Sequence, residues 1–294
     1  MKPKIDLTSP ITQLIIKIQQ IEAKKAWEME NSVEKAVIPI CSLPATKAHQ
    51  KKKEKPIQTG SGVIVKIKNE FFIFSATHVF ENFNGMGLLT SPPGRNQIEQ
   101  ISGERFSSGN LATKIDKFDA TVFHIQSEIS QPLKDLAITL DDFDFEGYDP
   151  IKPIFMITGF LAKESNTAGN EIKSLANNFP TIELDDYKGY GYEKEDYILL
   201  SYENQVLINN RWQMTPIPRG MSGGAIIKAQ GTSLKNFGKE RKRDKQLLSG
   251  ITIEQHRDKG NKLGFLLGTR VNVFIDLIHK FMPEVLEEFL KSKK

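Results

Sequence analysis

The sequence predicts an all-β body with a helix at each end, and three observations support this prediction. Short apolar runs rich in Val, Ile and Phe recur along the middle of the chain. Turn residues separate these runs and no helical pattern alternates with them, so we expect antiparallel strands in a sandwich or barrel rather than βαβ units. Apolar residues with helical spacing appear near both termini.

The N-terminal helix is expected over residues 9–30. Ser9 can cap it, and Pro10 suits the first helical turn. One apolar stripe follows, formed by Ile11, Leu14, Ile15, Ile18 and Ile21. Such a stripe packs on the body of the protein or on a partner protein, and the sequence leaves both possibilities open.

The strands begin with a hairpin in "GSGVIVKIKNEFFIFSATHVF", where "KNE" forms the turn. Further strands are expected in "DATVFHI", "DLAITL", "PIFMITGF", "YILLSY", "AIIKA", "LLSGITIE" and "LGFLLGTRV". The C-terminal helix is expected over residues 272–292, with Asn272 as its cap. Pro283 should break it and start a second short helix.

Composition and charge exclude several classes of protein. The chain has 294 residues, 39% of them hydrophobic and 26% charged, with a net charge of +4. These values are typical of a globular protein and do not mark a nucleic-acid binder, and the basic segments 47–55 and 228–245 are expected as surface loops. Cys41 is the only cysteine, which excludes an internal disulfide. No secretory signal or membrane span is recognisable, so we expect a cytoplasmic protein with no membrane partner.

Ser222 is the first candidate for a catalytic residue. It follows Gly220 and Met221 and precedes Gly223 and Gly224, directly before an apolar strand. A nucleophilic serine needs free approach to its oxygen and nearby backbone N–H groups for an oxyanion. Glycines supply the tight turn and leave that space open, although a plain glycine-rich turn would look the same.

His78 is the candidate general base, because "FFIFSATHVF" places it after small residues at the end of a strong strand. The other histidines lack such a setting; they are His49, His124, His256 and His279. The acid that would orient His78 is expected to be Asp135, at the start of "DLAITL". Asp119 in "FDATVFHI" is the rival, because it also begins an apolar run.

Taken together, these motifs resemble the trypsin-like (chymotrypsin-fold) serine peptidases, in a branch that is not secreted. The resemblance rests on "SATHVF" around His78, "DLAITL" after Asp135 and "GMSGGAII" around Ser222, which follow in the family's order. It covers about residues 57–282 and implies two antiparallel β-barrels. The first barrel is expected at about 57–145 and the second at about 150–271, within a peptidase domain of 51–294. Residues 1–50 would form a helical extension and charged connector.

The resemblance also implies the roles of individual residues. Ser222 would attack the scissile carbonyl, His78 would move the proton, and the N–H groups of Gly220 and Ser222 would form the oxyanion hole. Asp135 is preferred as the triad acid because "DLAITL" matches the family pattern. The substrate-binding residues implied are Pro216, Ser249, Gly250 and Gly264.

Two positions depart from secreted members of the family. Met221 cannot pair with a new N-terminus, so activation by zymogen cleavage is not expected. Pro216 places no charge under the specificity pocket, so a small or apolar residue is expected before the cut. Glu254 is the acid that could instead attract a basic side chain.

The sequence therefore predicts a serine endopeptidase that acts on protein or peptide substrates and needs no metal or organic cofactor. The alternative is a catalytically silent barrel that serves as an adaptor, with residues 9–30 docking on a partner protein. A nucleic-acid-binding module that uses the lysine-rich segments is a further, weaker alternative.

Overall fold

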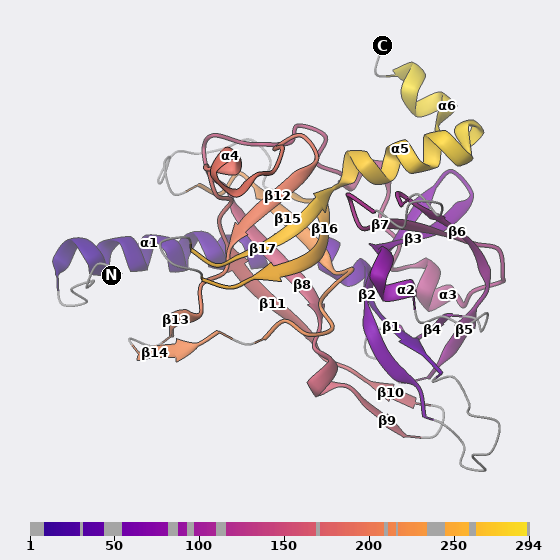
Figure 1. Ribbon diagram of the computed structural model, residues 1–294, viewed down its shortest axis with the longest axis horizontal. Coiled ribbons are helices and arrows are strands. Elements are labelled where there is room, and N and C mark those ends of the chain that lie inside the picture. Colours follow the sequence, from indigo (N-terminus) through magenta and orange to yellow (C-terminus); the bar gives the residue numbers. More distant parts are fainter. Residues whose placement is uncertain are drawn as a thin grey trace.

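A computed structural model describes residues 9–29, 32–43, 55–81, 88–92, 97–109, 116–168, 171–208, 211–215, 217–233, 245–258 and 263–292. Most strands in this part of the chain belong to two antiparallel sheets, which confirms the expected all-β class. Figure 1 shows the two sheets side by side, with α1 (Pro10–Trp27) projecting from the second. No helix in the described ranges is long and apolar enough to cross a membrane.

The first sheet has seven strands in the order β5-β4-β1-β2-β3-β7-β6. Their bounds are β1 Val37–Ser42, β2 Ile57–Ile67, β3 Glu70–Ala76, β4 Leu88–Thr90, β5 Glu99–Ile101, β6 Gly103–Ser107 and β7 Ala120–Ile125. The expected hairpin is present as β2 and β3. Alternate apolar residues such as Ile64, Phe72 and Phe74 are fully buried and hold this sheet on its core.

The second sheet has six strands in the order β11-β8-β15-β16-β17-β12. Their bounds are β8 Ile154–Phe160, β11 Ala176–Thr181, β12 Tyr197–Ser201, β15 Ala225–Gln230, β16 Lys245–His256 and β17 Phe265–Arg270. Two small hairpins lie outside it, β9 (Asn166–Ala168) with β10 (Glu171–Lys173) and β13 (Gln205–Ile208) with β14 (Arg211–Met214).

The helices are short, apart from those near the ends of the chain. They are α2 Thr77–Phe80, α3 Gln131–Lys134, α4 Tyr187–Tyr190, α5 Val271–Phe281 and α6 Pro283–Ser292, with single 3₁₀ turns at Val33–Ala36, Leu140–Asp142 and Ala162–Glu164. The break at Pro283 lies where the sequence predicts it. In α5, Phe274 stacks on Phe74 of β3 with 5.0 Å between ring centroids, so the helix that follows the second sheet covers the first.

Three expectations about the elements are wrong. "DLAITL" is not a strand: Asp135 caps the C-terminal end of α3, and only an isolated bridge joins Ile138 to Val65. Residues 1–50 are not separate from the first barrel, because β1 pairs with β2 inside the sheet. Lys228 does not belong to a surface loop; it is buried in β15, and residues 234–244 lie outside the described ranges. The same is true of 44–54 in the charged connector.

The second half of α1 is part of the body of the protein. Buried Glu22 accepts the Ser233 N–H at 2.9 Å. Buried Gln246 on β16 donates to the Ala26 carbonyl at 3.0 Å and accepts the Val33 N–H at 2.9 Å. The first half of the helix projects, and its apolar residues Ile11, Leu14 and Ile15 are exposed.

Candidate active site

His78 lies on the one-turn helix α2, which directly follows β3. Val79 and Phe80 are buried on the other side of this turn, and Phe80 stacks on Phe123 of β7 with 5.8 Å between centroids. Packing of these two apolar side chains fixes the turn and leaves the imidazole of His78 43% exposed.

Asp119, and not Asp135, is the acid beside His78. Its Oδ2 lies 2.6 Å from His78 Nδ1, and its Oδ1 accepts the His78 backbone N–H at 2.9 Å. The Asp119 carbonyl also accepts the Thr77 N–H at 3.0 Å. Asp135 accepts a hydrogen bond from Gln131 within α3 instead, at 2.6 Å. The expectation for Asp135 is therefore corrected: its run is a helical turn, and its carboxylate stays on that turn.

Asp116 holds Asp119 in an unusual backbone conformation. The φ angle of Asp119 is +48°, a left-handed value that a residue with a side chain seldom adopts. Oδ1 of Asp116 accepts the N–H groups of Phe118 and Asp119 at 3.2 and 2.9 Å, and Oδ2 accepts the Thr77 hydroxyl at 2.6 Å. These bonds tie the loop that carries Asp119 to the helix that carries His78.

The second sheet anchors the same loop from the other side. The phenol of Tyr197 on β12 donates to the Lys117 carbonyl at 2.6 Å. The hydroxyl of Thr269 on β17 donates to the Phe118 carbonyl at 2.5 Å. The position of Asp119 therefore depends on both sheets, although the residue itself leads into β7 of the first.

The environment of His78 favours its protonated form. The hydrogen bond that the His78 ring donates to the Asp119 carboxylate is the largest cause of its raised pKa, and the negative charges of Asp119, Glu81 and Glu254 add to it. Partial burial acts in the opposite direction but is the smaller effect. His78 is thus a stronger base than a free histidine, and Asp119 fixes which ring nitrogen carries the proton.

Ser222 lies in the turn that precedes β15. Its Oγ donates to the Ile253 carbonyl of β16 at 3.3 Å, and no hydrogen bond joins it to His78 in this structure. The segments that carry His78 and Ser222 both lie against Gly60 of β2. A Cβ at Gly60 would lie 2.6 Å from the side chain of Val79, the neighbour of His78, and 2.8 Å from the Ser222 carbonyl oxygen.

Close packing around Ser222 leaves no room for a side chain at Gly223. Gly223 has a φ of +84°, and a Cβ there would lie 2.0 Å from the Ser61 carbonyl oxygen. Ser61, fully buried on β2, donates its N–H to the Ser222 carbonyl at 2.8 Å and its hydroxyl to the Gly220 carbonyl at 2.9 Å. The first sheet therefore holds the turn that carries Ser222.

Neighbouring hydrogen bonds set the directions of the Gly220 and Ser222 N–H groups. The Arg219 carbonyl accepts from Ala162 at 2.9 Å, and the Met221 carbonyl accepts from Gly224 at 2.8 Å. In a trans peptide the N–H points opposite to its carbonyl, so each of the two N–H groups points away from these contacts. Neither N–H donates to any residue in the described ranges, which leaves both available to an oxygen of a ligand.

The expected substrate-binding residues fare differently. Ser249 is buried, with its hydroxyl on Asp144 at 2.6 Å, and Gly250 is paired between β15 and β17, so neither reaches Ser222. Ser222 contacts β16 further along, at the Ile253 carbonyl. The sequence predicted no role for Ile253 and marked the next residue, Glu254, only as an acid that could attract a basic side chain. The Gly264 N–H donates a hydrogen bond to the Asp258 carboxylate at 2.7 Å. Pro216 lies outside the described residues.

Both sheets, with the helices at the ends, match the chymotrypsin-like fold of two β-barrels. A solved structure with this fold is neuropsin, a serine protease expressed in the limbic system of mouse brain, which superimposes with a TM-score of 0.50 at 13% sequence identity. The superposition covers 86% of this chain and 98% of neuropsin. No family model matches the sequence, and no curated protein matches it. The comparison supports the fold that the resemblance implied.

Proposed function

We propose that the protein is a serine endopeptidase in which His78, Asp119 and Ser222 form the catalytic triad. The observation that carries the proposal is the contact of 2.6 Å between Asp119 and His78 Nδ1. With Nδ1 held in this way, Nε2 is the ring nitrogen left to accept a proton. Ser222 lies on the adjacent turn. Neuropsin, which has a similar fold, is a serine protease, and this also supports the proposal.

The proposed first step begins with rotation of the Ser222 side chain away from the Ile253 carbonyl and toward His78. Unliganded sites often show loose catalytic hydrogen bonds that tighten when substrate binds. Ser222 Oγ then forms a bond to the scissile carbonyl carbon as its proton moves to Nε2 of His78. The N–H groups of Gly220 and Ser222 stabilise the negative charge on the carbonyl oxygen, and Asp119 stabilises the imidazolium.

The second half of the reaction reverses these roles. His78 gives its proton to the leaving amine, and the peptide bond breaks to leave an ester on Ser222. A water molecule, deprotonated by His78, then attacks this ester. The bond between the acyl carbon and Ser222 Oγ breaks, His78 returns the proton to Oγ, and the new carboxyl terminus is released.

Labelling with a fluorophosphonate probe tests the proposal directly. We expect wild-type protein to be modified on Ser222, and Ser222→Ala to lose both labelling and peptide hydrolysis while its melting curve stays unchanged. Ser201→Ala is a matched control, because Ser201 is a half-buried serine on β12 of the same sheet. Folded Ser222→Ala protein that still cuts peptides would refute the assignment.

A second function is favoured by the exposed half of α1 and by the hydrogen bond from Ser222 to Ile253. In this alternative the barrels are catalytically silent, and Ile11, Leu14 and Ile15 bind a partner protein. The same labelling experiment separates the two functions, because a silent barrel leaves the probe unreacted at every serine.

A further inference from the structure

The edge of β16 next to Ser222 has a stretch of backbone with no strand partner among the described residues. β15 pairs with β16 as far as Ala225 and Ile251, and Gly223 and Gly224 extend the ladder to Thr252. The chain then turns away to Ser222, so on this edge no described residue forms a ladder with Ile253–His256. The bond from Ser222 Oγ to the Ile253 carbonyl marks the start of the free stretch.

An extended peptide can add to this edge in line with β15 and pair with β16 in the same antiparallel direction as β15 does. β16 runs away from Ser222 toward His256, so an antiparallel peptide approaches Ser222 from its own amino-terminal side. The residue that carries the scissile carbonyl then faces Ile253. The residue before it lies opposite Glu254, where side chains of paired strands are in contact distance.

Glu254 is placed to act on that side chain. Its carboxylate is 63% exposed and lies 3.3 Å from His256 Nε2. His256 stacks on Phe265 with 4.5 Å between centroids, and the Tyr192 hydroxyl lies 3.4 Å from its Nε2. The carboxylate therefore stands beside aromatic rings, and this combination of groups suits a Lys or Arg side chain through both charge and cation–π attraction.

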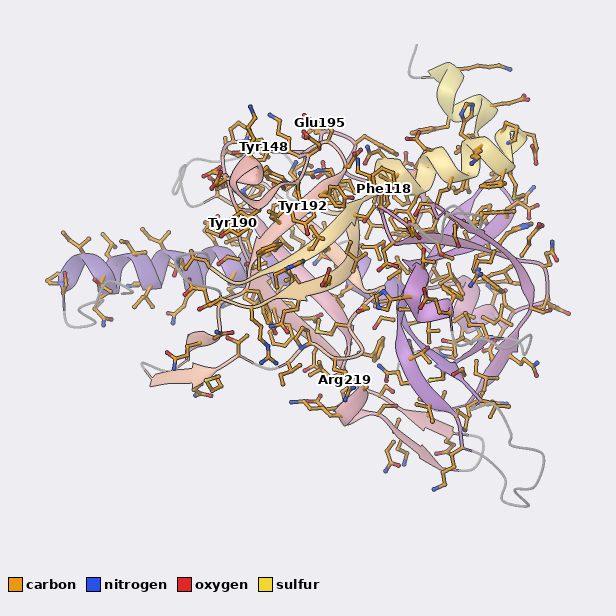
Figure 2. The ribbon with its side chains drawn as sticks, in the orientation of Figure 1. Phe118, Tyr148, Tyr190, Tyr192, Glu195 and Arg219 are labelled. Atoms are coloured by element: carbon orange, nitrogen blue, oxygen red, sulfur yellow. The ribbon has the colours of Figure 1, made fainter. Side chains whose placement is uncertain are left out.

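The aromatic residues connect Glu254 to the triad. The ring of Tyr192 lies 5.1 Å from that of Tyr197, and Tyr197 lies 5.9 Å from Phe118, the neighbour of Asp119. Figure 2 shows Tyr192 and Phe118 on one side of the molecule and Arg219 well away from both. Among the described residues, Glu254 forms an ion pair with His256 and none with Arg219, the exposed cation that precedes Gly220. The negative charge of Glu254 also contributes to the raised pKa of His78.

We propose that Glu254 selects substrates with lysine or arginine at the second residue before the cut. This inference rests on the proposed peptidase activity and adds a substrate class to it. It leaves the expectation for the residue immediately before the cut, which came from Pro216, as a separate prediction.

The experiment begins with a diverse peptide library, in which the cut sites of the wild-type protein are read by mass spectrometry. One well-cut peptide is then made in three forms, with Lys, Gln or Glu at the second residue before the cut. We expect kcat/KM to be about tenfold lower for the Glu peptide than for the Lys peptide. The exchange replaces an attraction between exposed charges with a repulsion, and each of these effects is small. High salt should reduce this ratio, because the Debye length falls from ~10 Å at 0.1 M to ~3 Å at 1 M.

Two variants assign the preference to Glu254. In Glu254→Gln the Lys-to-Glu ratio should approach one, and in Glu254→Lys it should invert. Ratios between peptides are compared within each variant, so a change in His78 that affects all three peptides cancels. Glu287→Gln on α6 is the matched control, since it removes the same charge from a carboxylate with 62% exposure; its ratio should equal that of wild type.

The outcomes separate this inference from the proposed function. If no serine is labelled and no peptide is cut, the peptidase assignment fails, and the specificity proposal fails with it. If Ser222 is labelled and peptides are cut, but the ratio is the same in wild type and Glu254→Lys, only the role of Glu254 is overturned. A basic preference found solely after the cut also overturns it, because the peptide would then run in the opposite direction.

Discussion

The carboxylate of Asp119 forms two hydrogen bonds with His78: Oδ2 lies 2.6 Å from ring nitrogen Nδ1, and Oδ1 accepts the backbone N–H at 2.9 Å. The carboxylate therefore fixes both the turn that carries the histidine and the orientation of its ring. An asparagine of the same shape can hold the backbone, but it loses the charge and can select the wrong tautomer.

The first prediction compares two aspartates. We expect Asp119→Asn to lower kcat by about 10⁴-fold, the cost of removing the charge of a triad acid. Asp135→Asn should keep activity, because among the described residues the Asp135 carboxylate bonds to Gln131 of its own helical turn and not to His78. Hydrolysis is measured at matched folded fraction, with melting curves for both variants. A dead Asp135→Asn together with an active Asp119→Asn would reverse the assignment.

The second prediction concerns pH. His78 must be neutral to accept a proton, and its pKa is raised above the ordinary value of 6.5, chiefly by the hydrogen bond with Asp119. Activity should therefore be low in acid and rise with pH through a midpoint above 6.5. Glu254→Gln removes one of the charges that raise this pKa, so the midpoint should move to lower pH. The profile of kcat/KM against pH measures the shift, and Glu287→Gln should show none.

The third prediction tests Ser61 as a positioning residue. Its hydroxyl donates to the Gly220 carbonyl and accepts the Phe160 N–H, both at 2.9 Å. Ser61→Ala should cost about 1–3 kcal/mol of stability, because buried partners lose their bonds. It should also slow fluorophosphonate labelling of Ser222, since the turn loses one of its supports.

Thr59→Ala provides the control for Ser61. Thr59 lies on the same strand, and its hydroxyl makes one bond to the Ile40 carbonyl, at 3.2 Å. Its loss should cost about 1 kcal/mol and leave the labelling rate unchanged. Equal labelling rates in both folded variants would contradict a positioning role for Ser61.

The fourth prediction concerns the buried ion pair below the second sheet. Lys228 is 1% exposed, and its Nζ lies 3.2 Å from Oδ1 of fully buried Asp144. Lys228→Met leaves that carboxylate buried without its cation and should lower the free energy of unfolding by about 3–5 kcal/mol. Lys245→Met removes a half-exposed partner of Asp142 and should cost less than ~1 kcal/mol. Denaturant titrations of the two variants compare these losses.

The sequence predicted the parts of the site whose signals are local. Strong strand patterns and small residues marked His78, and closely spaced glycines marked Ser222. Asp119 could not be separated from Asp135 in this way, because each precedes an apolar run. The difference lies in contacts distant in sequence: Asp116 and Tyr197 hold the loop at Asp119, whereas Asp135 caps α3.

Strand pairing between distant segments accounts for the other errors. The strand expected from "LLSGITIE" is longer in the structure, Lys245–His256, and its pairing with β17 shifts between Thr252 and Glu254. On the edge beside Ser222, β15 covers Ser249 and Gly250, and Gly223 and Gly224 bond to Thr252, so Ile253 and Glu254 are the residues next to Ser222. β1 was missed because it is a short strand interrupted by Pro39, and its partner β2 is separated from it by the charged connector.

The reciprocal anchoring of the loops that carry Asp119 and Ser222 has a consequence for dividing the chain into fragments. The first sheet holds the turn of Ser222 through Ser61, while the second sheet holds the loop of Asp119 through Tyr197. A protein cut near residue 147 into two fragments would leave each fragment without half of its supports. The rate of peptide hydrolysis would then measure how much of the two fragments had reassembled, because neither fragment would hydrolyse peptides alone.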